Sequence, residues 1–423
     1  MEELSLTSVL SKVKESYAVE WILENVKKEI SVSQFGGLAG SSAVLALVYL
    51  VHNWYKNMDS TGKVVKVSLL DFRKAYELIN HNILLENFMN IGVRPSLIRW
   101  FATYLQGRHQ MCTFRNEKSE CKSIKGGIPQ GSKLGPLAFV IKINQLANVV
   151  KTPSDDQNGS SDQEDIVIFM DDTTLSEVID VTNHVSGDFI GNSQSNVDSI
   201  TRFTENEQME LNAKKCSEVI VDFRKNKTVI PPVCIGQQPM SRVKTFKLLG
   251  LWMNDNLNWE TNTEYIIKKA TKRLYFLKVL KSYGAPKNDL KTFYCCVIRS
   301  TLEYGAQVWN GNLTQAQRGD IERVQKRALR IIVPEYEYNR ALQECGLKTL
   351  QQRRDDLCVR LIEQMLEPSH KLHSLLPRKC SEVKERKTRT NSGKFHNFFC
   401  RTERLKCTPL AYAIEKYNDR LNG

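Results

Sequence analysis

The stretch IVIFMDDTTL, residues 166–175, constrains the fold of this chain more than any other feature. Five apolar residues predict a buried strand, two adjacent aspartates follow, and a second strand-like run comes next. The pattern predicts a β-hairpin with Asp171 and Asp172 at its tip. Adjacent carboxylates repel each other, and their desolvation is costly unless a cation compensates them. The tip is therefore either a solvent-exposed turn, where aspartate is common, or a binding site for a divalent metal ion.

Length, charge and cysteine usage narrow the class of protein. A chain of 423 residues is expected to form two or three domains. Its formal net charge of +13 indicates a polyanionic partner, with nucleic acid favoured over a membrane surface. The eleven cysteines are an odd number, and no signal peptide precedes them, so they indicate free thiols in a reducing, intracellular compartment.

One apolar segment raises the question of a membrane span. Residues 38–55 read LAGSSAVLALVYLVHNWY, and the unbroken apolar part covers only residues 43–51. A spanning helix needs about 20 apolar residues. The segment therefore predicts a buried helix, and no membrane association is expected.

Hydrophobic periodicity predicts a mixed region followed by a helical one. Strands are expected at residues 64–72, 218–223 and 246–253, with a hairpin at 111–124. Helices are expected at residues 1–35, 74–90, 96–105, 135–148 and 193–209. Beyond a boundary near residue 258, helices dominate, at residues 264–280, 287–304 and 315–333.

Two segments are unusually polar. Residues 153–165 are acidic and of low complexity, which predicts a disordered surface loop. Residues 378–406 contain ten Lys or Arg against three Glu, which suits either phosphate contact or a solvated tail. The Cys and His residues of this region, Cys380, His396, Cys400 and Cys407, do not have the spacing of a compact zinc site.

A third carboxylate completes a candidate metal site. Asp71 ends the strand predicted at residues 64–72. If this strand neighbours the hairpin in one sheet, Asp71, Asp171 and Asp172 converge. Three hard oxygen ligands suit Mg²⁺, which prefers carboxylates combined with substrate phosphates. Two such ions could activate an attacking hydroxyl and stabilise a leaving pyrophosphate.

The order of the motifs resembles that of reverse transcriptases from non-LTR retrotransposons of the LINE-like and jockey-like kind. VSLLDFRKAYELINH (67–81) and FMDDTTL (169–175) resemble the two catalytic motifs, and GGIPQGSKLGPLAFVIKINQL (126–146) resembles the glycine-rich loop with its helix. LNAKKCSEVIVDF (211–223) and FKLLGLWMNDNLNW (246–259) resemble the next two motifs. LEYGAQVW (302–309) and IERVQKRALRII (321–332) are similar to the thumb and the segment after it, so the resemblance covers nearly the whole chain.

The resemblance implies an α+β fold of the right-hand polymerase type. It consists of a palm, in which helices cover one face of an antiparallel sheet, with partial fingers and an all-α thumb. The implied domains are partial fingers at 1–60, a palm at 61–258 with the acidic loop at 152–165, a thumb at 259–345, and a basic C-terminal region, helical or irregular, at 346–423.

The implied activity is that of an RNA-directed DNA polymerase, a nucleotidyltransferase that adds deoxynucleotides to a primer 3′-hydroxyl. The implied cofactor is a pair of Mg²⁺ ions, with Mn²⁺ as a substitute. The implied partners are an RNA template, a DNA primer and deoxynucleoside triphosphates, with an endonuclease acting separately. Action on chromosomal DNA slightly favours the nucleus over the cytoplasm.

The resemblance also implies roles for individual residues. Asp71, Asp171 and Asp172 would bind metal, and Lys215 would stabilise the leaving pyrophosphate. The residues expected at the nucleotide and template are Phe72, Tyr76, Gly127, Pro129, Gln130, Gly131, Phe169 and Met170. Leu249 and Gly250 would form the turn that grips the primer. Outside the motif, Tyr76 is equally consistent with packing on the sheet, Lys215 with a surface lysine and Gly250 with a structural glycine.

Some positions depart from the family pattern. EELSLTSVLSK (2–12) resembles a fingers segment of the form YRPISLT, but Glu2 and Glu3 stand where the family has Arg-Pro. The expectation is an N-terminally truncated enzyme that holds its triphosphate poorly, because a triphosphate needs cationic partners. The alternative is an inactive remnant that folds and binds nucleic acid only. Glu77 and Gln145 also depart from the family pattern, but no departure removes a metal ligand.

Overall fold

The computed structural model describes residues 8–115, 117–150, 164–182, 192–380 and 393–421. The chain divides into two units. The first unit comprises Met1–Ala43, Val65–Ile220 and Asn226–Val243, and the second comprises Val44–Val64, Val221–Lys225 and Lys244–Gly423. Glu2 and Glu3, residues 151–163 of the acidic segment and the basic run at 384–389 lie outside the described residues.

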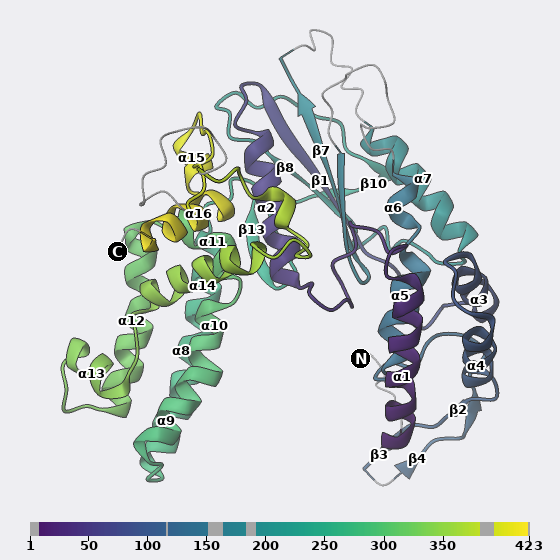
Figure 1. The fold of residues 1–423 in the computed structure, drawn as a ribbon, viewed down its shortest axis with the longest axis horizontal. Coiled ribbons are helices and arrows are strands. Elements are labelled where there is room, and N and C mark those ends of the chain that lie inside the picture. Colours follow the sequence, from purple (N-terminus) through teal and green to yellow (C-terminus); the bar gives the residue numbers. More distant parts are fainter. Residues whose placement is uncertain (1–7, 116, 151–163, 183–191, 381–392, 422–423) are drawn as a thin grey trace. The chain divides into compact units, whose positions relative to one another are not determined.

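A five-stranded sheet forms the centre of the first unit, in the order β11-β8-β1-β7-β6. Its strands β8, β1 and β7 are labelled in Figure 1. Its strands are β1 (Lys63–Leu70), β6 (Glu164–Phe169), β7 (Asp172–Asp180), β8 (Ser217–Val221) and β11 (Ser241–Arg242). β6 and β7 are antiparallel, whereas β8 and β11 are parallel. β1 lies in the middle of the sheet, and five consecutive residues from Val64 are buried, as expected for a strand covered on both faces.

The helices of the first unit are α1 (Val9–Val26), α3 (His81–Asn90), α4 (Pro95–Leu105), α5 (Leu134–Ile143), α6 (Leu146–Val149) and α7 (Ser193–Asn206). In Figure 1, α1 and α5 lie next to α3 and α4; α5 packs against both α1 and α3, and α3 packs against α4. Apart from Lys142, which is buried and paired with Glu207, α5 is apolar and almost completely buried, so it forms the core of this layer. The rings of Phe88 and Phe101 stack between α3 and α4 at 4.7 Å.

Short strands of the first unit make three separate two-stranded ribbons. In the first unit, β2 (His109–Gln110) pairs with β5 (Lys122–Ser123), and β3 (Thr113–Phe114) pairs with β4 (Glu117–Lys118). This confirms the hairpin predicted at residues 111–124. β9 (Cys234–Ile235) pairs with β10 (Gln238–Pro239).

The second unit is mainly helical. Its longest helices are α8 (Glu260–Ser282), α12 (Gln315–Ile332) and α14 (Leu350–Met365); α8 packs against α12, and α14 against α16. Both α12 and α14 begin with a capping box, which satisfies the first backbone amides. The other elements are α2 (Ala43–Asn57), β12 (Thr245–Leu248), β13 (Leu251–Asn254), α9 (Lys287–Phe293), the π-helix η2 (Tyr294–Arg299), α10 (Ser300–Glu303), α11 (Ala306–Trp309), η3 (Asn310–Asn312), α13 (Tyr338–Cys345), η4 (His373–Leu375), α15 (Glu403–Lys406) and α16 (Pro409–Arg420).

The predicted α+β class is confirmed, and three predicted helices are wrong in extent. The helix expected at 74–90 begins only at His81, because Lys74 has a φ of +49° and the Asn80 side chain caps the backbone amides that follow it. The helix expected at 135–148 breaks at Asn144, whose side-chain amide binds the Ser31 N–H and the Glu29 carbonyl instead. The N-terminal helix ends at Val26 rather than near residue 35.

The buried helix predicted at residues 38–55 is confirmed as α2. Within the ranges that the structure describes, no helix combines the length and apolarity needed to cross a bilayer. The four predicted domain ranges stay a prediction.

Candidate active site

Two neighbouring strands bring the three predicted aspartates to one end of the sheet. In the β6–β7 hairpin, Phe169 pairs with Asp172, so Met170 and Asp171 form the tip. Asp71 follows the last residue of β1, and β1 is the strand next to β7. The sequence predicts that the three carboxylates converge if the two strands are neighbours. In the structure, β1 and β7 are neighbours.

The carboxylates influence each other strongly. Partial desolvation, together with the charges of Asp171 and Asp71, raises the pKa of Asp172 to about 6. Asp71 Oδ2 is buried without a hydrogen-bond donor, although the Lys215 ammonium lies 3.5 Å from it. Such a group of acidic oxygens favours a cation.

A complete metal-binding cluster is nevertheless absent from the described residues. In the part of the chain that the structure describes, no three His, Cys, Asp or Glu side chains are arranged to hold a metal ion. Mg²⁺ usually takes one or two protein carboxylates and completes its shell with water and substrate phosphates. The donor set of Asp71, Asp171 and Asp172 fits such an ion when substrate supplies the remaining oxygens.

A second chain segment fixes Asp71 and brings Lys215 to it. The Asn212 N–H donates to the Asp71 carbonyl at 2.8 Å, and the Arg73 N–H donates to the Glu210 carbonyl at 2.8 Å. These bonds align the two segments, and a turn in which the Lys215 N–H donates to the Asn212 carbonyl then carries the lysine back to the carboxylate. The Lys215 side chain is 68% exposed, so its ammonium is free to move.

A pocket of about 320 Å³ lies beside the hairpin tip. It is lined by Tyr76, Pro129, Gln130, Gly131, Gly135, Pro136 and Asp171. The Tyr76 ring stacks on Phe139 of α5 with centroids 4.6 Å apart, and both burial and the Asp171 charge raise the pKa of its hydroxyl. Tyr76 therefore packs on a core helix and also lines the pocket, and its contact with a nucleotide stays a prediction.

The glycine-rich loop that borders this pocket is tied to the turn after Asp71. The Gly127 N–H donates to the Ile79 carbonyl at 2.8 Å, and the Ile128 N–H donates to the Tyr76 carbonyl at 2.9 Å. Gly127 has a φ of +80°, and a Cβ there would lie 2.7 Å from the Glu77 carbonyl oxygen. Only glycine fits this approach, so the loop and the Tyr76 turn move together.

The remaining predicted residues divide into those near the pocket and those away from it. Gln130 also lines a second pocket of about 200 Å³ that includes Arg108 and Glu77. Phe72 is buried in the core of the first unit and bridges to Leu211. Phe169 pairs with Asp172, and Met170 takes a φ of +57° at the tip.

Glu15 is a site residue that the sequence interpretation missed. Its fully buried carboxylate accepts hydrogen bonds from the Lys133 and Leu134 N–H groups, at 2.6 and 3.3 Å, at the start of α5. It also accepts from the Ser11 and Tyr104 hydroxyls, at 2.9 and 3.2 Å. A carboxylate at a helix N-terminus is favoured by the helix dipole.

A sequence signal for this role existed, because Glu15 shares the helical face of Ala18, Ile22 and Val26, which are all buried.

The predicted primer grip lies in the second unit. Leu249 and Gly250 form the two-residue turn between β12 and β13, with φ of +45° and +91°. Positive φ at both positions is typical of the tightest hairpin turns. The Tyr304 hydroxyl donates to the Leu249 carbonyl at 2.7 Å, and a Cβ at Gly250 would lie 2.9 Å from the Tyr304 ring. The tight turn is present, and its contact with a primer stays a prediction.

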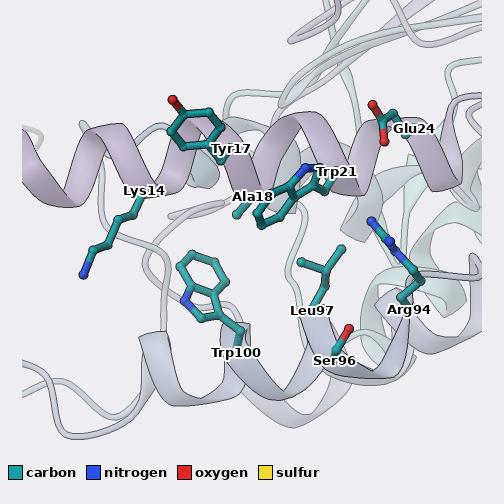
Figure 2. Close-up of a pocket in the computed structure, with 9 residues that line it drawn as sticks. All are labelled: Lys14, Tyr17, Ala18, Trp21, Glu24, Arg94, Ser96, Leu97 and Trp100. Carbon is teal, nitrogen blue, oxygen red and sulfur yellow. The ribbon is translucent and has the colours of Figure 1, made fainter.

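A larger pocket lies apart from these residues. Its volume is about 620 Å³, and it lies between α1 and α4. Figure 2 shows Tyr17 and Trp21 from α1 facing Leu97 and Trp100 from α4. None of its lining residues belongs to the predicted site.

Comparisons with known proteins bear on the family. The model described as reverse transcriptase (RNA-dependent DNA polymerase) matches residues 3–253. A model described as the N-terminal part of alkylated DNA repair protein alkB homolog 8 matches only residues 259–300.

Curated relatives include the RNA-directed DNA polymerase from mobile element jockey of Drosophila melanogaster, 25% identical over 341 residues, 78% of this chain and 35% of the relative. The probable RNA-directed DNA polymerase from transposon X-element of the same species is 23% identical over 78% of this chain and 35% of the relative. The Pol polyprotein of retrotransposable element R2 from Popillia japonica is 24% identical over 55% of this chain and 40% of the relative. The chain thus spans little more than a third of the length of the curated relatives it matches.

Among solved structures, apo telomerase from Candida tropicalis matches 86% of this chain and 60% of that chain, with 12% identity and a TM-score of 0.44, which is too low to support a conclusion. The match to the family model does support a conclusion, because it covers more than half of the chain. It includes both carboxylate motifs, the glycine-rich loop and Lys215. The chain therefore belongs to the reverse transcriptase (RNA-dependent DNA polymerase) family, as its motifs predict.

Proposed function

We propose that this chain catalyses RNA-templated DNA synthesis, adding deoxynucleotides to the 3′-hydroxyl of a DNA primer. The observation that carries the proposal is the adjacency of β1 and β7, through which Asp172 interacts electrostatically with both Asp171 and Asp71. Three neighbouring carboxylates next to a pocket of nucleotide size suit a reaction at a triphosphate.

Asp71, Asp171 and Asp172 would hold two divalent ions, Mg²⁺ or Mn²⁺, together with phosphate oxygens of the incoming nucleotide. The bound ions would lower the pKa of the primer hydroxyl and neutralise charge on the leaving pyrophosphate. Asp71 Oδ2 supports this assignment, because it is a buried acceptor without a hydrogen-bond donor, and its one ion-pair partner is the exposed Lys215 ammonium 3.5 Å away.

The other residues of the site would position substrate. Lys215 would leave Asp71 and place its ammonium on the pyrophosphate, which its exposure permits. Tyr76 would select deoxynucleotides, because its ring is held by Phe139 and cannot withdraw from a ribose 2′-hydroxyl. Gln130 and the backbone of Gly131 would contact the nucleotide and the template base beside it.

The partners would be an RNA template, a DNA primer and deoxynucleoside triphosphates, which agrees with the formal net charge of +13. Leu249 and Gly250 would hold the primer end at the tight turn after β12. An endonuclease acting separately would supply that primer end in chromosomal DNA, which would favour the nucleus over the cytoplasm.

The test is deoxynucleotide incorporation on an RNA template with an annealed DNA primer in Mg²⁺. The variant is Asp171→Asn/Asp172→Asn, and the matched control is Asp180→Asn at the other end of the same strand. We expect incorporation to fall at least a thousandfold in the double variant and to persist in the control. A wild-type chain that binds the primer–template but adds no nucleotide would refute the proposal and support an inactive, nucleic-acid-binding remnant.

A further inference from the structure

A short segment runs along the outer edge of the hairpin that carries Asp171 and Asp172. The Phe35 N–H donates to the Ile168 carbonyl at 2.7 Å, and the Ile168 N–H donates to the Ser33 carbonyl at 2.9 Å. Gln34 and Ile168 form a parallel β-bridge. Residues 33–37, which we call the strap, thus extend the sheet beyond β6, on the side away from β7.

The strap then contacts the hairpin tip itself. A Cβ on Gly36 would lie 2.4 Å from the Met170 backbone nitrogen and 2.9 Å from the Phe169 carbonyl carbon. Backbone atoms cannot rotate away as a side chain can, so any larger residue at Gly36 would displace the tip. The Gly36 N–H is held by the Gln34 side-chain oxygen at 2.8 Å, which fixes the strap at the point of contact.

The tip has an unusual conformation that needs support. Met170 has a φ of +57°, a left-handed backbone conformation that is unfavourable for a residue with a Cβ. Its side chain packs against the core of the first unit, and its Sδ would lie 3.0 Å from a Cβ placed on Gly37. The same Cβ would meet Val140 of α5 at 2.9 Å, so Gly37 lies between the tip and α5.

These contacts matter because Asp171 and Asp172 are like charges on adjacent residues. Without support, repulsion would spread the two carboxylates and move the tip. Ligands of a divalent ion must be held within about 0.5 Å of their working positions. The strap supplies backbone contacts on one side of the turn that carries both carboxylates.

We infer that the strap holds the hairpin tip in position for metal binding, and that Gly36 is a positioning residue for Asp171 and Asp172. The inference rests on the proposed function, because it assumes that these carboxylates bind divalent ions. It assigns a role to a segment that lies more than a hundred residues from the hairpin in sequence and outside the motifs that carry the family resemblance.

The test compares Gly36→Ala with Gly40→Ala. Gly40 lies in the same loop with a φ of +77°, but a Cβ there would meet nothing within 4 Å, so this control carries backbone strain without the contact. Mn²⁺ binding is measured directly, by the loss of the free-ion paramagnetic resonance signal. The Mn²⁺ dependence of incorporation, primer–template affinity and thermal unfolding are measured beside it.

We expect Gly36→Ala to weaken Mn²⁺ binding at least tenfold and to raise the Mn²⁺ concentration for half-maximal incorporation by the same factor. Primer–template affinity should stay unchanged, and Gly40→Ala should bind Mn²⁺ like the wild type. Wild-type Mn²⁺ affinity in a folded Gly36→Ala chain would overturn the inference.

A second variant keeps the inference testable if Gly36→Ala does not fold. Met170→Ala adds no atom and removes the side-chain part of the contact, so we expect it to fold and to weaken Mn²⁺ binding about threefold. Unchanged Mn²⁺ binding in Met170→Ala would then overturn the inference. Failure of the proposed function gives a different result: the Asp171→Asn/Asp172→Asn chain would then bind Mn²⁺ as tightly as the wild type.

Discussion

Removal of the Glu15 carboxylate should both destabilise the first unit and weaken nucleotide binding. In Glu15→Ala, the Leu134 N–H and the Tyr104 hydroxyl lose their buried acceptor. The buried Leu134 N–H left without a partner costs about 1–3 kcal/mol, and the half-buried Tyr104 hydroxyl costs less because water can reach it. Loss of the negative charge at the start of α5 adds about 0.3–1 kcal/mol. The Lys133 N–H lies nearer to solvent, where water can replace the carboxylate, so we expect a total loss of about 3 kcal/mol.

The functional consequence follows from the position of α5. The loop that lines the proposed nucleotide pocket leads directly into this helix, and the Ser132 hydroxyl links the Pro129 carbonyl to the Gly135 N–H. A frayed first turn would therefore loosen Gln130 and Gly131. We expect the KM for deoxynucleotide to rise several-fold, while the affinity for the primer–template changes little.

Urea unfolding followed by circular dichroism measures the loss of stability, and steady-state incorporation measures the KM. Glu15→Gln serves as a graded variant, because its amide keeps one acceptor oxygen but loses the charge, and its loss should be smaller. Glu20→Ala, on the exposed face of α1, is the matched control. A loss below about 1 kcal/mol in Glu15→Ala, or a loss equal to that of Glu20→Ala, would refute the reasoning.

Two further predictions concern the second unit. Burial lowers the pKa of His52 from 6.5 to about 4, so its contribution to stability is present above pH 6.5 and is lost as the pH falls toward 4. The shift corresponds to about 3 kcal/mol, and His52→Leu should remove that part of the acid sensitivity in urea unfolding measured from pH 7 to pH 4; an unchanged pH profile would contradict it. Gly250→Ala should cost about 1–2 kcal/mol and shorten primer extension, because its Cβ would meet the Tyr304 ring in a strained turn. Gly284→Ala has a similar φ of +79° with no neighbour within 4 Å, and equal behaviour of the two variants would exclude a role for the Tyr304 contact.

The sequence by itself determined the local features of the candidate site. The apolar run before Asp171 and Asp172 predicts the first strand of a hairpin, because a buried strand consists of apolar residues that are consecutive in the sequence. Asp71 at the end of a buried strand and the glycine-rich loop at 126–132 are equally local, and their order along the chain was sufficient to predict the family. The helices after residue 258 were predicted by the same periodicity.

Only the tertiary structure decided how these elements meet. The order β8-β1-β7-β6 places Asp71 beside the hairpin, and no pattern within either strand specifies its neighbour. The helical spacing of apolar residues also predicted too early a start for the helix that begins at His81. Ala75 and Ile79 in the preceding turn are buried, although they are not helical. The Glu15 carboxylate binds the start of α5, and Gly36 contacts Met170. In both contacts the partners lie more than a hundred positions apart in the sequence. Contacts of this kind arise when the whole chain packs, so sequence periodicity, which records one element at a time, cannot contain them.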